Sequence, residues 1–168
     1  MDAIALLHEL YGRIPGEVRR AVEGLTPEQL VARPADGANT IGWLVWHLTR
    51  VQDHHVSELL DEPQLWQSGD WAASFGLDAD PHDTGYGHDA ADVARVRPAS
   101  ADAALAYFDA VHARTTAYLA TLAPADLDRV VDERWDPPVT LGVRLVSIAD
   151  DDVQHAGQAA YARGLLGA

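Results

Sequence analysis

Apolar residues recur at every third or fourth position in four separate segments of the chain, and this spacing limits the folds that the chain can adopt. The segments cover residues 2 to about 23, 40 to about 60, 100 to about 122, and 140 to 165. A repeat of three or four places apolar side chains on one face of an α-helix. The spacing therefore predicts an all-α fold, a four-helix bundle in which each helix buries one face.

Polar residues mark where three of these helices should begin. Thr40, Ser100 and Thr140 each stand before an apolar stripe, and such side chains accept hydrogen bonds from the free backbone N–H groups of a first helical turn. Within the first segment, Pro15 cannot donate a backbone hydrogen bond, so we expect it to bend or split that helix.

Length and composition favour one domain. The chain has 168 residues, of which 48% are hydrophobic. A chain of this length and hydrophobic content can form one hydrophobic core, but it is too short for two separate domains with a core each. We therefore expect residues 1–168 to form a single helical bundle domain.

Charge, cysteine content and hydropathy exclude several classes of function. Twelve basic residues, all arginine, stand against 26 acidic ones, and the net charge of −14 disfavours nucleic acids and anionic membranes as partners. Without cysteine, the chain has neither a thiol nucleophile nor a Cys-ligated zinc site of its own. It shows no apolar run of about 18 residues and no signal-peptide pattern, so we expect a cytoplasmic protein.

Similar short motifs at helix boundaries recur in the two halves of the chain. "LTPEQL" at 25–30 returns as "LAPADL" at 122–127, and "NTIGWL" at 39–44 returns as "VTLGVR" at 139–144. An internal repeat of two helical hairpins would give the second and fourth helices matching places in the bundle. They would then run in the same direction with their inward faces in contact.

The segment at 61–99 is too long for a tight connection between the second and third helices. Loops of this length in a compact domain are usually functional or disordered. Its aromatic residues argue against disorder, because burying them offsets the conformational entropy that the segment loses when it becomes ordered. These residues are Trp66, Trp71, Phe75 and Tyr86. We expect a long crossover that forms a structured flap, with a shorter crossing strap at 132–138.

Two residues of the fourth helix have the spacing of metal ligands. Asp151 and His155 lie four positions apart, so both project from one face on successive turns, beside the apolar stripe. A buried carboxylate needs an arginine, a metal or access to water. His47, at the margin of the stripe on the second helix, could face them. Two histidines and a carboxylate suit zinc, nickel, iron or manganese and leave positions open for water or substrate.

Other interpretations of these residues stay open from spacing alone. Asp151 could pair with Arg144 or be solvated. His55, near the middle of the apolar stripe, is typical of a neutral core imidazole bonded to a carbonyl or to Asp152. We expect His54 to turn toward solvent, and His8 and His112 to lie on helix surfaces.

A geometric objection applies if Thr40 and Thr140 cap their helices at the same level. His47 would then lie about 10 Å along its helix, while Asp151 and His155 would lie about 16 and 22 Å along theirs. Unless tilt or axial offset closes that gap, His55 becomes the better ligand.

Two motifs resemble those of the DinB-like family, within the superfamily that includes thiol-dependent S-transferases and mycothiol-dependent maleylpyruvate isomerases. "TIGWLVWHL" is similar to the family's second-helix pattern, and "DDVQHAGQAAYARG" to its fourth. The resemblance covers nearly the whole chain and implies metal ligands at His47, Asp151 and His155. Asp151 departs from the usual His or Glu. Gly157 would allow close helix packing, and Gln158 would bond near the last ligand.

The resemblance implies three functions. The first is a divalent-metal-dependent S-transferase, in which the ion stabilises the thiolate of a mycothiol-type co-substrate that attacks a small electrophile. The second is a metal-dependent hydrolase, and the third a non-enzymatic metal-binding stress protein. In either enzyme, the expected substrate contacts are His55, Trp71, Tyr86 and His88. Exposed tryptophans or helix faces are compatible with a homodimer.

Overall fold

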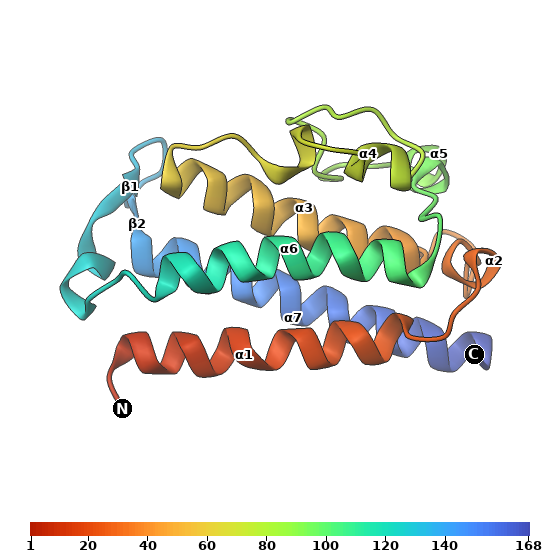
Figure 1. The fold of residues 1–168 in the computed structure, drawn as a ribbon, viewed down its shortest axis with the longest axis horizontal. Helices are drawn as coiled ribbons and strands as arrows, with labels where there is room; N and C mark the ends of the chain where they lie inside the picture. Colours follow the sequence, from red (N-terminus) through yellow and green to blue (C-terminus); the bar gives the residue numbers. More distant parts are fainter.

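Four long helices form the bundle that the sequence predicts (Figure 1). In the computed structural model, which describes all 168 residues, they are α1 (Ala3–Val22), α3 (Ile41–Leu60), α6 (Ala101–Leu119) and α7 (Leu141–Leu166). The caps are as expected, because Thr40, Ser100 and Thr140 accept backbone N–H groups at 3.1, 3.0 and 3.4 Å. Pro15 lies inside an unbroken α1 and does not split it.

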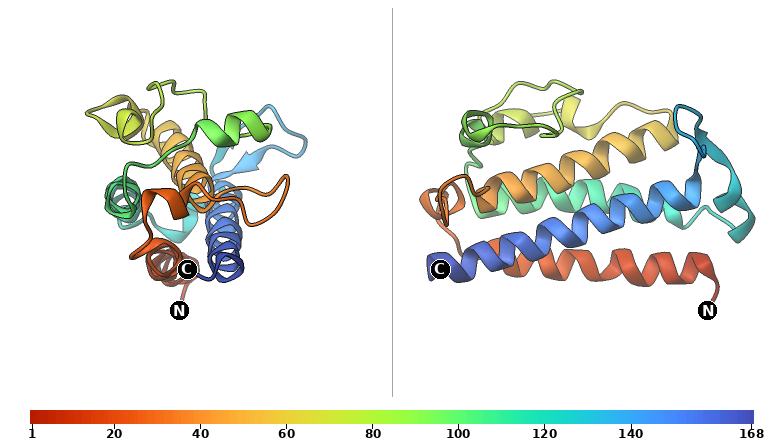
Figure 2. Two further views of the ribbon diagram at one scale, coloured as in Figure 1. Left: turned by 90° about the vertical axis from the view of Figure 1, so that its right-hand side faces the viewer. Right: turned by 180° about the vertical axis from the view of Figure 1, so that it is seen from behind.

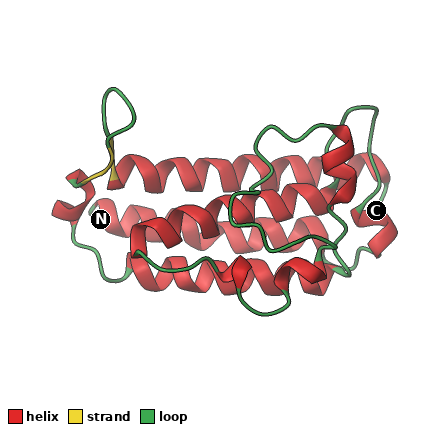
Figure 3. Cartoon of the chain, turned by 90° about the horizontal axis from the view of Figure 1, so that it is seen from above, coloured by secondary structure: helices red, strands yellow, loops and turns green.

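Shorter elements connect the long helices. They are α2 (Pro27–Leu30), the 3-10 turn η1 (Leu65–Gln67), α4 (Trp71–Ser74), α5 (Ala90–Arg95), the 3-10 turn η2 (Pro124–Asp128), β1 (Val130–Asp132) and β2 (Val139–Thr140). β1 and β2 pair antiparallel with an irregular register, so the predicted strap is the tip of a small hairpin. The flap, residues 61–99, crosses above α3 and contains η1, α4 and α5 (Figure 1). Seen from above, loops cross over the long helices (Figure 3).

Seen end-on, α1 and α3 occupy opposite corners of a square, and each packs against both α6 and α7 (Figure 2). Buried apolar residues from all four helices form one contiguous core. The buried Tyr11 hydroxyl donates to the backbone carbonyl of Leu145 at 2.8 Å and so joins α1 to α7. No helix has both the length and the apolar character that a membrane span requires.

The helices α3 and α7 run in opposite directions, so the parallel arrangement predicted from the repeat is wrong. His47, near the start of α3, lies beside Asp151 and His155, whereas His55, near its end, lies beside the earlier residue Arg144. α3 and α6 instead run in the same direction (Figures 1 and 2). Parallel neighbours need a connection that returns along the bundle, and the long flap provides it.

Candidate metal centre

His47 on α3 and the pair Asp151 and His155 on α7 lie together in the structure. Asp151 Oδ1 is 3.9 Å from His47 Nε2 and 3.4 Å from His155 Nε2. One ligand atom from each residue fits within 4.8 Å of the others, which is a spacing that one metal ion can bridge. The two imidazole rings meet edge to face at 4.8 Å between centroids.

The antiparallel packing of α3 and α7 removes the objection about axial level. His47 lies 13 positions before Leu60, the last residue of α3, and His155 lies 14 positions after Leu141, the first residue of α7. At about 1.5 Å per residue, these positions lie about 20 and 21 Å from the same end of the helix pair. His47 therefore faces His155 without any axial offset.

Hydrogen bonds fix which nitrogen of each imidazole faces the site. His47 Nδ1 bonds the backbone carbonyl of Thr84, and His155 Nδ1 lies 3.0 Å from the side-chain oxygen of Gln158. Because both partners only accept, each Nδ1 carries the hydrogen, and each neutral ring presents a lone pair at Nε2. When both rings are neutral, two Nε2 lone pairs and a carboxylate oxygen thus converge.

The protonation of the two histidines differs. Burial lowers the pKa of His47 and outweighs the Thr84 hydrogen bond and Asp151, which favour the charged ring. Burial also lowers the pKa of His155, but the hydrogen bond and charge of Asp151, together with Gln158, raise it above its ordinary value overall. His47 is therefore the neutral member of the pair, and His155 is the one that retains a proton more readily.

The carboxylate of Asp151 is incompletely satisfied. Its Oδ2 atom is buried and has no hydrogen-bond partner, an arrangement that is costly for a charged group without a counter-ion. Arg144 does not supply one, since its guanidinium bonds Asp132 at 2.9 Å. The pairing of Asp151 with Arg144 is therefore absent, and the donor set fits a divalent cation.

Aromatic and glycine residues enclose the His47 side of the site. Trp43 stacks on His47 at 4.7 Å between ring centroids, with 12° between the planes. On the other side, a Cβ atom at Gly85 would lie 2.8 Å from His47 Nδ1 and 2.8 Å from the Trp46 ring. The imidazole of His47 is thus enclosed by Trp43 of its own helix and by the backbone of the flap at Gly85.

A cavity of about 560 Å³ opens beside the ligands. His47 and Asp151 are part of its wall. The other lining residues are Val51, His54, His55, Glu58, His82, Thr84, Tyr86 and Arg134. The volume and the open position next to the ligands suit a small molecule.

The predicted substrate contacts separate into two groups. His55 and Tyr86 line this cavity, and Tyr86 is 94% exposed at its edge. Trp71 does not line it, because it packs against Tyr107 at 5.5 Å between centroids. His88 does not line it either: it accepts a hydrogen bond from Trp43 Nε1 at 3.1 Å and bonds Asp83 at 2.9 Å.

His55 lies outside the ligand set and is not a core imidazole. It is half-buried, with Glu58 3.1 Å from its Nδ1 and Arg144 3.2 Å from its Nε2. His54 accepts from Gln64 at Nδ1, so its Nε2 carries the hydrogen and faces Glu58 at 3.7 Å. Although His54, His55 and Glu58 lie close together, their lone pairs are used in this network, which disfavours a second metal site.

Some positions around the centre differ from the sequence interpretation. Asp152, the other partner considered for His55, is fully buried and has no hydrogen-bond partner; burial first, and then Asp151, raises its pKa well above the ordinary value. A Cβ at Gly157 would meet nothing within 4 Å, so the close packing expected there is wrong. His112 is half-buried and stacks on Phe108.

Sequence reasoning missed Thr84 and Gly85, which support His47, and Arg50, which holds their segment. Thr84 acts through its backbone carbonyl, so its residue type gives no signal. The two glycines of "DTGYGH", Gly85 and Gly87, were the available signal, because both have positive φ values, of 91° and 79°, that favour glycine.

Comparison with known proteins places the chain in a family. The family profile of the DinB superfamily matches residues 11–159. The chain belongs to the DinB superfamily. A conserved protein of Enterococcus faecalis is similar to this DinB chain, with 33% identity and a TM-score of 0.90 over 100% of this chain and 99% of that one.

YfiT from Bacillus subtilis shares the DinB bundle at lower identity. It is described as a probable metal-dependent hydrolase with an unusual four-helix bundle topology, and it is 20% identical with a TM-score of 0.67. The alignment covers 98% of this chain and 87% of YfiT. At this identity the likeness concerns the fold alone. No curated protein matches the DinB chain.

Proposed function

We propose that this DinB protein is a divalent-metal-dependent enzyme that acts on a small molecule, with the ion held by His47, Asp151 and His155. The convergence of two Nε2 lone pairs and one carboxylate oxygen is the observation that carries the proposal. With both imidazoles neutral, these three acceptors would face one another unless a cation lay between them. The set suits zinc, nickel, iron or manganese.

Three protein ligands leave part of the coordination sphere free. When bound, such an ion would lower the pKa of a water or thiol beside it and so supply a nucleophile at neutral pH. The chain's own residues bind and orient: Thr84 and Gln158 fix the imidazole tautomers. Trp43 and Gly85 limit the movement of the His47 ring.

Hydrolysis is the reaction class that the cavity favours. His54, His55 and Glu58 line the same cavity as His47 and Asp151, so further titratable groups lie near the open position. In hydrolysis, the oxygen of water bonds to the electrophilic carbon, the bond to the leaving group breaks, and the leaving group takes up a proton. The description of YfiT as a probable metal-dependent hydrolase supports this choice.

Thiol S-transfer is the second candidate. Since the chain has no cysteine, the sulfur would come from a co-substrate such as a mycothiol-type thiol. A cavity of about 560 Å³ can hold part of such a thiol beside the ligands. Turnover of an activated ester by the metal-loaded protein without any thiol would select hydrolysis. Turnover of a small electrophile that requires added thiol would select transfer.

Metal binding itself is tested with a pair of isosteric variants. Asp151→Asn should weaken Zn²⁺ binding, measured by calorimetry, by more than the roughly 100-fold that losing a supporting contact can cost. Asp150→Asn is the matched control, because Asp150 is exposed on the same helix and bonds only Gln154. Equal affinities of the two variants, or no binding by the unaltered protein, would reject the proposed site.

A further inference from the structure

Arg50 is fully buried on α3, one turn after His47. Its guanidinium donates to the backbone carbonyls of Asp83 at 3.1 Å, Pro81 at 3.2 Å and Asp80 at 3.5 Å. A buried arginine is costly unless its charge and its donors are satisfied. Here the side chain takes most of its partners from one flap segment, residues 80–83.

The same segment is tied back to α3 through a second set of bonds. The Asp83 carboxylate accepts the backbone N–H of Gly85 at 3.2 Å and lies 2.9 Å from His88 Nε2. His88 in turn accepts from Trp43, whose ring stacks on His47. The backbone between Asp83 and Gly85 is thus fixed from both ends.

This fixed backbone contacts a proposed metal ligand. The Thr84 carbonyl accepts the hydrogen of His47 Nδ1, and the next residue, Gly85, leaves no room for a Cβ beside that nitrogen. The partner of a ligating imidazole sets its tautomer and its orientation. A shift of the segment would therefore turn the Nε2 lone pair of His47 away from Asp151.

We infer that Arg50 is a positioning residue for the metal centre, acting through flap residues 80–85 on the tautomer and orientation of His47. The inference rests on the proposed function for the identity of the centre. Arg50 makes no hydrogen bond or ion pair with His47, Asp151 or His155, so its role in metal affinity would be indirect.

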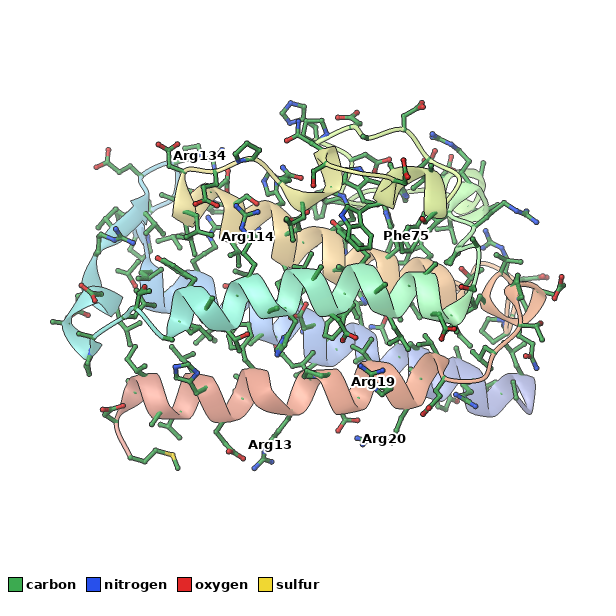
Figure 4. All side chains as sticks on the ribbon, viewed as in Figure 1. Arg13, Arg19, Arg20, Phe75, Arg114 and Arg134 are labelled. Atoms are coloured by element: carbon green, nitrogen blue, oxygen red, sulfur yellow. The ribbon has the colours of Figure 1, made fainter.

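The chain offers a matched control for Arg50. Arg114 on α6 (labelled in Figure 4) is also close to Asp53, at 3.8 Å, but it holds a different part of the flap, through the carbonyl of Pro63 at 2.9 Å and Glu62 at 2.7 Å. Arg50 lies 3.6 Å from the same carboxylate, so loss of either arginine removes a cation from Asp53. Only loss of Arg50 releases residues 80–83.

Gly85 and Gly87 provide a second matched pair. Both have positive φ, so alanine is strained at either position. A Cβ at Gly85 would strike His47 and Trp46, whereas a Cβ at Gly87 would meet nothing within 4 Å. The pair separates contact with His47 from backbone strain, and it avoids the buried charge in case Arg50→Gln does not fold.

The experiment measures Zn²⁺ affinity by calorimetry on the full chain, with circular dichroism to verify folding. Gly85→Ala and Arg50→Gln should each bind Zn²⁺ about 10- to 100-fold more weakly, the range for loss of a supporting contact. Gly87→Ala and Arg114→Gln should keep the affinity of the unaltered protein. Equal affinities of folded Arg50→Gln and Arg114→Gln, or of Gly85→Ala and Gly87→Ala, would overturn the inference.

A second measurement separates this inference from the proposed function. In the metal-free protein, ¹⁵N NMR of the imidazoles should show the Nδ1–H tautomer for His47. Arg50→Gln and Gly85→Ala should lose it, while Arg114→Gln and Gly87→Ala should keep it. This result would support the positioning role even if the unaltered protein bound no Zn²⁺, which would reject only the proposed function. A His47 tautomer that is the same within either folded pair would overturn the inference.

Discussion

The two histidines of the candidate centre present the same atom, Nε2, but hold their protons differently. A metal ligand must be a neutral imidazole, so protons compete with the ion for the site. Burial lowers the pKa of His47, which favours its neutral ring. Asp151 raises the pKa of His155 against the effect of burial, so His155 is the first of the two to take up a proton as the pH falls.

We predict that Zn²⁺ binding releases a proton from His155 at pH values below its raised pKa. Below the raised pKa of His155, the apparent affinity should fall by about tenfold per pH unit, as expected when one proton is displaced per ion. Calorimetry in two buffers of different ionisation enthalpy measures the released proton. An affinity that does not change between about pH 8 and pH 6, the range around the ordinary histidine pKa, would contradict the prediction.

The stability of the metal-free protein should depend on pH in the opposite direction from the metal affinity. The folded-state pKa of His155 is raised above its unfolded value. Its contribution to stability is therefore fully present below the unfolded pKa and is lost as the pH rises through the folded pKa. Acid thus weakens the metal complex while it favours the interaction of protonated His155 with Asp151.

For the individual residues of the site, the sequence could predict side-chain ligands but not backbone contacts. His47, Asp151 and His155 were proposed as ligands because imidazoles and carboxylates on apolar helix faces are conspicuous, and the structure brings them together. The carbonyl of Thr84 could not be proposed, because every residue has one. The place of a loop carbonyl depends on tertiary contacts, here those of Arg50.

The helix α3 buries two faces, and its sequence pattern reveals only one of them. The apolar face packs in the bundle, while Arg50 and Asp53 lie on a polar face that the flap covers. Asp53 is 1% exposed and accepts the backbone N–H groups of Leu65 and Trp66 at 3.0 and 2.8 Å and the Tyr107 hydroxyl at 2.8 Å. Asp53 therefore joins α3, α6 and the flap.

Asp53→Ala should strongly destabilise the protein. The substitution leaves Arg50 buried near no carboxylate and removes the acceptor of two backbone N–H groups, and breaking such a buried pair costs about 3–5 kcal/mol of unfolding free energy. Urea unfolding followed by circular dichroism measures this. Arg13→Ala is the control, because Arg13 pairs with Glu9 on the surface, where such pairs contribute up to about 1 kcal/mol. Similar losses in both variants would contradict the role of Asp53.

Helix positions were predictable from the sequence, but helix directions were not. Capping residues and apolar spacing are local, so Thr40, Ser100 and Thr140 located three starts correctly. The motifs that recur at the helix boundaries show where a helix begins, but they carry no information on the direction of the neighbouring helix. The length of residues 61–99 was the better signal, because a flap that long can return the chain along the bundle and make α3 and α6 parallel.

The candidate centre joins distant parts of the molecule. His47 on α3 and His155 on α7 come from opposite halves of the chain, and these two helices pack along much of their length (Figure 2). An ion held between them would exist only in the folded state. Its binding energy would therefore add to the stability of the whole bundle.

We accordingly predict that metal raises the thermal unfolding midpoint. An ion at 100 times its dissociation constant stabilises the folded state by about 2.7 kcal/mol. In a chain of this size, each kcal/mol shifts the midpoint by about 2–4 °C, so the rise should be about 5–11 °C. Differential scanning fluorimetry with Zn²⁺ and with a chelator measures it. His47→Ala should abolish the rise, whereas His8→Ala, a histidine on α1 outside both histidine clusters, should keep it. A rise that survives His47→Ala would place the ion elsewhere in the molecule.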